Sequence, residues 1–260
     1  MAARAGLSVI ALPITIDGIS YPAGASVSAV LAAMQQGQEV HTSRPSPAEF
    51  TRQYRTLLDA GASSVVSIHV SAQLSGTYQA ALAGAAEFGD AVKVVDSGSV
   101  AYGLGFAVLG ALAAARVGAS MTEIIKRAQG QVDAWFSVEN LNPLQTGGRL
   151  ITPSPSQAVF TARPLLQLKG GMIIPAGKTR TLPQALRQMA ELSATEGVDA
   201  QIAICHAGAE PAARMLAEQI TAKLPDAQIV VAQVDAVLAA HVGPGMVGVM
   251  VYRSPHSTTS

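Results

Sequence analysis

The sequence predicts an α/β protein made of two α/β domains, with a largely parallel sheet in the first. Short apolar, β-branched runs alternate with segments of helical periodicity along the chain, and this alternation is typical of strand–helix–strand units. Hydrophobic residues make up 49% of the 260 residues and charged residues 13%, which is enough apolar material for two modest domains. Loop-forming residues at 152–156 follow Gly147-Gly148-Arg149 and predict domains at 1–150 and 151–260.

Each predicted element follows from its local pattern of apolar residues. The expected strands are residues 7–14, 65–70, 92–96, 134–138, 172–175, 201–205, 228–233 and 246–252, and the expected helices are 28–36 (ended by Gly37), one after Ser46, one after Thr77, and 100–117, 121–131, 182–196 and 210–224. Asp96 is expected to cap the helix that follows it.

The helix after Ser46 has the clearest start signal in the chain. Ser46 and Glu49 have the spacing of a capping box, and Pro47 occupies the first helical position. Since Ser46 does the capping, Thr42 and Ser43 are left in the preceding loop with hydroxyls available for another role.

The turn Ser75-Gly76-Thr77 lies between a buried strand and a helix. Backbone N–H groups and the helix dipole at such a point attract an anion, and two hydroxyls beside a glycine suit a small anionic head group. No lysine follows as a phosphate-binding Walker A loop would require. The alternative interpretation is that Ser75 only caps the helix.

Composition excludes several classes of function. The net charge is zero and the isoelectric point about 7.0, without a basic cluster, which argues against a nucleic-acid partner. Cys205 is the single cysteine, so it forms no internal disulfide, and we expect it to be buried in a strand. The spacing of His41, His69 and His206 does not suit metal ligands; we expect structural roles for them and no metal or cofactor.

The sequence also predicts a cytoplasmic protein. No stretch has the 18 or so consecutive apolar residues that a membrane span requires. Arg4 and a short apolar run near the N-terminus are followed by Asp17 without a clear cleavage site, so a signal peptide is not expected.

Six ordered motifs resemble the DegV family over nearly the whole chain. They are Thr42-Ser43-x-Pro45-Ser46, Leu74-Ser75-Gly76-Thr77-Tyr78-Gln79, Asp96-Ser97, Gly147-Gly148-Arg149, Lys178-Thr179-Arg180 and His241-Val242-Gly243-Pro244-Gly245. The resemblance implies a non-enzymatic protein that buries a long-chain fatty acid, such as palmitate, in a tunnel between its two domains. It also implies that some members present the bound acid to a fatty acid kinase, which makes acyl-phosphate.

The resemblance assigns roles to particular residues. Hydroxyls at positions matching Thr42 and Ser75 hold the carboxylate, with Ser43, Gly76 and Thr77 in the same loops. The positions that match Arg149, Arg180 and His241 lie near the head group or on the surface that faces a partner. For His241, the residues alone also allow a loop histidine bonded to backbone.

Two departures from the family stand out. Members usually begin with a strand followed by Thr-Asp-Ser, ahead of the point that matches residues 3–6, and we expect the first domain to lack that strand. Arg44 stands where glutamine is commoner in the family. An additional cation there would either strengthen carboxylate binding or be solvated.

Two other functions stay open at this point. The first is an α/β hydrolase or a phosphoryl-transfer enzyme with Ser75 as nucleophile, although the turn lacks the Gly-x-Ser-x-Gly pattern and needs a general base nearby. The second is an inert or regulatory remnant, which the missing first strand suggests.

Overall fold

The structure is a computed structural model that describes residues 7–22, 24–150, 163–194 and 200–253. Its strands are β1 (Ile14–Ile16), β2 (Ile19–Tyr21), β3 (Val40–Thr42), β4 (Val65–His69), β5 (Val92–Asp96), β6 (Gln131–Ser137), β7 (Arg163–Lys169), β8 (Met172–Thr179), β9 (Gln201–His206), β10 (Gln228–Gln233) and β11 (Val247–Arg253). Its helices are α2 (Val27–Gln35), α3 (Pro47–Asp59), α4 (Thr77–Ala85), α5 (Ala101–Arg116), α6 (Met121–Ala128), α7 (Asn142–Thr146), α8 (Leu182–Ala194), α9 (Glu210–Lys223) and α10 (Ala236–Val242), with a 3₁₀ turn at Gly89–Ala91.

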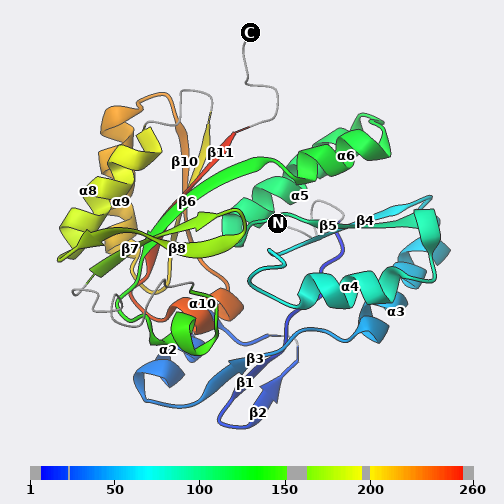
Figure 1. The fold of residues 1–260 in the computed structure, drawn as a ribbon, viewed down its shortest axis with the longest axis horizontal. Helices are drawn as coiled ribbons and strands as arrows, with labels where there is room; N and C mark the ends of the chain where they lie inside the picture. The colour runs from blue at the N-terminus through cyan, green and yellow to red at the C-terminus, as the bar shows by residue number, and fades with distance from the viewer. Residues whose placement is uncertain (1–6, 23, 151–162, 195–199, 254–260) are drawn as a thin grey trace.

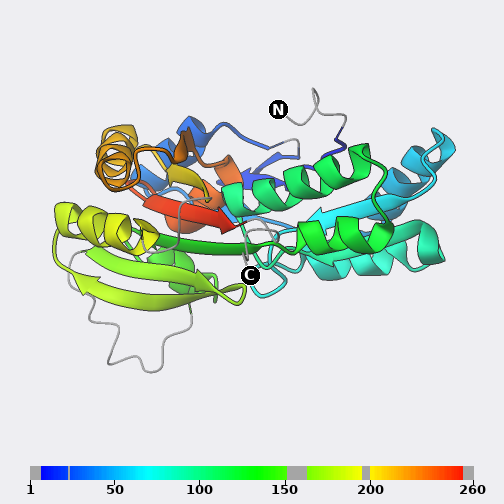
Figure 2. The ribbon, with the colours of Figure 1, turned by 90° about the horizontal axis from the view of Figure 1, so that it is seen from above.

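The largest sheet has six strands in the order β10-β9-β11-β6-β7-β8. Helices α8 and α9 cover one face of this sheet, as Figures 1 and 2 show. Only β9 and β10 are parallel, and the other four pairings are antiparallel. Strands β7 and β8 are joined through Gly170 and Gly171, both with positive φ, and such a tight hairpin imposes antiparallel pairing.

The second α/β unit is built on the parallel pair β4–β5. Side chains alternate between its two faces: Val65 packs with the cluster of Phe50 and Ala81 from α3 and α4, whereas Val66 and Ile68 pack toward α5 and α6. In Figure 1 this unit lies apart from the six-stranded sheet, with α5 reaching between them. Residues 65–69 therefore form a strand covered by helices on both faces.

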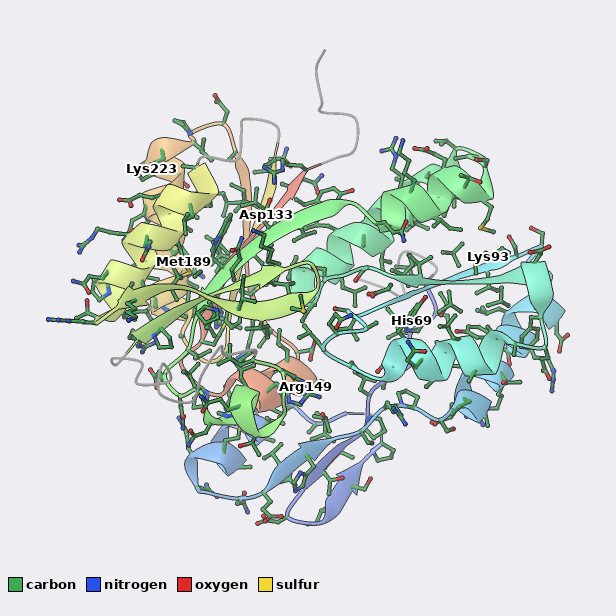
Figure 3. The ribbon with its side chains drawn as sticks, viewed as in Figure 1. His69, Lys93, Asp133, Arg149, Met189 and Lys223 are labelled. Carbon is green, nitrogen blue, oxygen red and sulfur yellow. The ribbon has the colours of Figure 1, made fainter. Side chains whose placement is uncertain are left out.

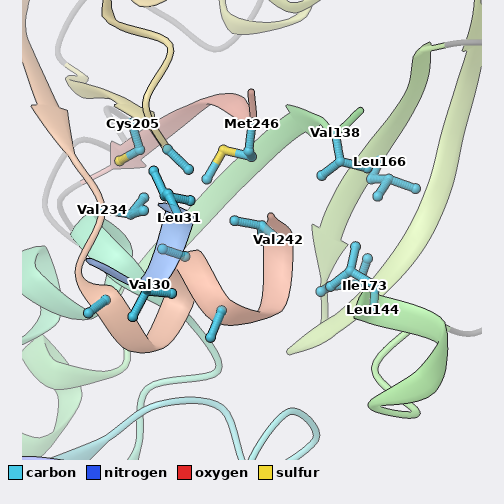
Figure 4. Packing of buried hydrophobic residues seen from close by; sticks show 14 of the residues in the cluster. Val30, Leu31, Val138, Leu144, Leu166, Ile173, Cys205, Val234, Val242 and Met246 are labelled. Atoms are coloured by element: carbon cyan, nitrogen blue, oxygen red, sulfur yellow. The ribbon is translucent and has the colours of Figure 1, made fainter. Parts of the chain in front are cut away.

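A third sheet is antiparallel and has the order β2-β1-β3. Helix α2 lies between β2 and β3 in the sequence. Figure 4 shows Val30 and Leu31 of α2 packed beside Val242 of α10 and Met246 before β11. Residues near the start of the chain thus share a core with residues more than 200 positions later.

The structure confirms the α/β class and most of the predicted elements. The capping box of Ser46 and Glu49 is complete, with both reciprocal hydrogen bonds, and Gly37 follows α2 at φ 73°. Cys205 on β9 is 1% exposed, as expected. The sheets are more antiparallel than strand–helix alternation predicts. Strand β7 and its hairpin with β8 were not predicted, and β11 runs antiparallel to both β6 and β9.

Three expectations about local structure are wrong. Thr42 is the last residue of β3 and pairs with Ile14 of β1, so only Ser43 of the two hydroxyl residues lies in the loop before α3. Residues 7–13 form no strand, because no strand edge in the described chain pairs with them, and Val9 is 70% exposed. Asp96 does not cap the next helix: α5 begins after Val100 without a side-chain cap, and Asp96 Oδ1 accepts from the backbone N–H groups of Ala72 and Gly98.

The domain boundary after residue 150 stays a prediction. Strand β6 precedes that boundary and pairs with β7 and β11, which follow it. The loop predicted at 152–156 and the end of the helix predicted to reach residue 196 lie outside the described residues. So do residues 3–6, the point ahead of which the family's first strand was expected.

Candidate functional site

A cavity of about 1100 Å³ lies between the sheets and helices. Most of the side chains that line it are apolar, and they come from segments far apart in sequence. Representative lining residues are Phe50, Leu57, Val108, Leu112, Leu144, Leu168, Ile173, Cys205 and Met250. Helix α5 (Ala101–Arg116) contributes one wall through Leu104, Val108, Ala111, Leu112 and Ala115.

A hydrogen bond between Thr42 and His241 lies in the cavity lining. Thr42 Oγ1 is 2.9 Å from His241 Nε2, although the two residues are 199 positions apart. His241 lies in the last turn of α10 rather than in a loop, so the loop interpretation is wrong. Helix α10 is held by Asp235, whose Oδ1 accepts from Leu238 N, and it ends at Gly243 with φ 73°.

The His241 imidazole is neutral at neutral pH. Burial lowers its pKa to about 4, and the nearby Arg149 cation contributes in the same direction. A neutral ring has one N–H and one acceptor nitrogen, so it bonds the Thr42 hydroxyl without adding charge to the site.

Two more hydroxyls meet at the turn before α4. Ser75 Oγ lies 2.7 Å from Thr77 Oγ1 and accepts from Thr77 N at 3.2 Å. The residue at the cap position of α4 is Gly76, which has no side-chain cap bond, so Ser75 is not the helix cap. The turn is tied down through Ser71, whose carbonyl accepts from the N–H groups of Leu74 and Ser75.

Arg44 lies directly against Gly76. A Cβ there would lie 2.3 Å from Arg44 Nη1, so any other residue would displace the guanidinium. Arg44 is exposed and lines the cavity beside the N-terminus of α4. Its charge adds to the positive end of the helix dipole, and both favour an anion at this place.

Arg149 adds a second cation on the same side of the cavity. Its Nε donates to Leu74 O at 3.0 Å and its Nη1 to Gly147 O at 3.2 Å. Burial lowers the pKa of the guanidinium, which stays charged. Figure 3 shows Arg149 at the level of α7 and α10, where the two units meet.

The predicted site residues fall into two groups. Those that line the cavity are Thr42, Ser43, Arg44, Ser75, Gly76, Thr77, Arg149 and His241. Arg180 does not line it: this exposed residue follows β8, and its backbone N–H donates to Gln184 Oε1.

Sequence reasoning missed a further polar group in the cavity wall. Tyr54, Ser67 and His69 line the cavity and are linked by hydrogen bonds. The available signal was the alternation of Ser67 and His69 on one face of an otherwise apolar strand, which places two polar side chains toward the helices that cover it.

The geometry around Ser75 does not favour a nucleophile. Its hydroxyl bonds only to Thr77, and within the described ranges no histidine or carboxylate side chain is hydrogen-bonded to it. The described residues contain no group of three or more His, Cys, Asp or Glu side chains that could hold a metal ion. Among the helices that the structure describes, none is long and apolar enough to cross a membrane.

The fold and the cavity define a class: a two-unit α/β protein with a large, mostly apolar cavity whose lining also holds hydroxyl, imidazole and guanidinium groups. A family model described as "Uncharacterised protein, DegV family" matches residues 1–254, so the chain belongs to the DegV family. A DegV domain-containing protein of Streptomyces coelicolor, SCO2569, is 37% identical over 261 residues, which cover 95% of this chain and 92% of that protein.

Two solved structures are similar to this one. A DegV family protein from Thermus thermophilus, described as fatty acid binding, has a TM-score of 0.88 and 30% identity, covering 97% of this chain and 94% of that one. DegV of Bacillus subtilis, described as a fatty acid binding protein, has a TM-score of 0.83 and 26% identity, covering 97% and 93%.

Proposed function

We propose that this protein binds a long-chain fatty acid, such as palmitate, without catalysing a reaction on it. One observation carries the proposal: the mostly apolar lining of the cavity of about 1100 Å³ includes the Thr42–His241 pair and the Ser75–Thr77 pair. Ligand pockets typically measure about 300–1,000 Å³, so this cavity has room for a long acyl chain.

The two ends of the ligand have different tasks. A tail of about fourteen methylenes, at about 0.8 kcal/mol each, supplies about 11 kcal/mol before the costs of association. Each hydrogen bond to the carboxylate adds about 1.5–3 kcal/mol. The tail therefore sets the affinity, and the hydroxyls of Thr42 and Ser75 set the orientation.

The guanidinium groups support an anionic head group. Arg44 and Arg149 both line the cavity, and neither forms an ion pair with a carboxylate among the described residues. Arg44 packs on Gly76 and Arg149 bonds to Leu74, so both cations flank the turn that carries Ser75. A carboxylate at this turn would meet donors and positive charge together.

The test is direct. Protein purified from its expression host is extracted with organic solvent and the extract is analysed by mass spectrometry; delipidated protein is then titrated with palmitate. We expect a co-purified long-chain acid and saturable uptake of one palmitate per chain. If no acid co-purifies and the delipidated protein takes up no palmitate, the proposal is overturned. Covalent labelling of Ser75 by a serine-directed phosphonate would instead support the enzyme alternative.

We also propose that a fatty acid kinase receives the bound acid. Arg149 at the junction of the two units and the exposed Arg180 are the residues that would contact its surface or a phosphate. A palmitate-loaded sample mixed with such a kinase and ATP should yield acyl-phosphate, and Arg180→Ala should slow its formation without changing palmitate affinity. No product with the unsubstituted protein would contradict this step.

A further inference from the structure

The cavity contains a second polar cluster on the side of α3 and β4. Tyr54 Oη donates to Ser67 Oγ at 2.9 Å, and Ser67 Oγ lies 2.8 Å from His69 Nε2. Tyr54 is 2% exposed and His69 7%, so both are more than nine-tenths buried, and all three residues line the cavity. Figure 3 shows His69 beside α4, at a different place from Arg149.

Accounting for the hydrogens leaves one donor without an acceptor. The Ser67 hydroxyl has one hydrogen and already accepts from Tyr54, and His69 Nε2 is the acceptor available to that hydrogen. Burial lowers the pKa of His69 to about 4, so its ring is neutral and carries a single hydrogen. When Ser67 donates to Nε2, that hydrogen lies on Nδ1. No hydrogen bond from Nδ1 exists among the described residues.

The position of the His69 ring is fixed by its neighbours. It makes edge-to-face contacts with Phe50, at 5.4 Å between ring centroids, and with Tyr78, at 6.4 Å. These aromatic rings hold the imidazole on the cavity wall. Because the ring cannot move to an acceptor elsewhere, a ligand has to bring the acceptor to it. A saturated acyl chain lying against the ring would cover this N–H without offering it an acceptor, which is unfavourable.

We infer that Tyr54, Ser67 and His69 form a second polar subsite, which accepts an oxygen substituent on the acyl chain of an oxygenated fatty acid. The inference rests on the proposed function and narrows it to a subclass of ligand. A hydroxyl or keto oxygen placed against the ring would accept from His69 Nδ1, while the carboxylate stays at Thr42 and Ser75.

The experiment compares palmitate with a series of 16-carbon acids that carry one hydroxyl at successive positions along the chain. Dissociation constants are measured by titration of the delipidated full-length protein. One hydroxyl position should bind about three- to tenfold tighter than palmitate, the effect of one net hydrogen bond, and the other positions should bind more weakly. If every isomer binds more weakly than palmitate, the inference is overturned while the proposed function stands.

Variants locate the effect. His69→Leu should abolish the preference for the favoured hydroxy acid while retaining palmitate binding. Leu112→Ala is the control, since Leu112 of α5 lines the same cavity but α5 packs against the face of β4 opposite to His69, so the change should affect both ligands equally. Tyr54→Phe should leave the preference in place, because the Ser67–His69 bond remains. A preference that survives in His69→Leu would overturn the subsite; no binding of palmitate or any isomer to the unsubstituted protein would instead overturn the proposed function.

Discussion

The two faces of the six-stranded sheet serve different purposes, although the same strands make both. On β9, Ile202 and Ile204 point toward α8 and α9, where the interior is filled by large aliphatic side chains. Cys205, the next residue, belongs to the opposite face and lines the cavity. Alternation along one strand thus separates a closely packed core from a wall that leaves space for a ligand.

This difference predicts that the α8–α9 face carries more of the stability. Leu216→Ala should lower the free energy of unfolding by about 2–5 kcal/mol, because Leu216 is completely buried and its truncation leaves a void. Met215, its neighbour on α9, is 46% exposed, and Met215→Ala should change stability by about 0.5 kcal/mol or less. Urea unfolding measures the free energy of unfolding of both variants. Equal losses would contradict the view that the interior between α9 and the sheet is closely packed.

The cavity wall should make the protein sensitive to acid. His69 and His241 have pKa values lowered to about 4 by burial, whereas an unfolded chain gives about 6.5, so the unfolded state binds more protons between these values. Stability is therefore present above pH 6.5 and is lost as pH falls toward 4. Two such groups give a slope of about 2.7 kcal/mol per pH unit near pH 5. His241→Gln should reduce the slope measured by urea unfolding across this range; an unchanged slope would show that His241 titrates alike in both states.

At the polar end of the cavity, Ser75→Ala should weaken palmitate binding by about 1–3 kcal/mol and leave the fold intact. The side chain bonds to Thr77 and does not cap α4, so the helix keeps its start. Titration with palmitate gives the affinity and circular dichroism checks the fold. Unfolding of the variant would return Ser75 to a structural role.

A residue of the cavity wall should lose less stability on truncation than Leu216 does. Ile173 is 6% exposed and borders the empty space, so Ile173→Ala removes fewer contacts than truncation of Leu216. We expect a loss at the low end of the range for such truncations, about 2 kcal/mol in unfolding free energy, and a several-fold rise in the dissociation constant of palmitate. A loss as large as that of Leu216→Ala would mean that the cavity wall is as tightly packed as the opposite face.

Local patterns predicted much of the fold. The α/β class, the capping box at Ser46, the helix in the region of α5 and the turn at Ser75 each depend on neighbours within one or two helical turns. The predictions that were wrong depend instead on contacts between segments far apart in the sequence. Residues 7–13 look like a strand, but a strand exists only where another edge pairs with it, and Asp96 bonds to backbone 24 residues away instead of to the next helix.

The sequence by itself determined which residues carry hydroxyls and charges, and the ordered motifs indicated the family. Only the tertiary structure decided that Thr42 meets His241, that Arg44 packs on Gly76, and that Tyr54, Ser67 and His69 meet in the cavity wall. The physical reason is that spacing along the chain encodes local geometry, whereas a cavity is the volume left over when distant segments have packed. The size and shape of the cavity therefore depend on all of those segments together.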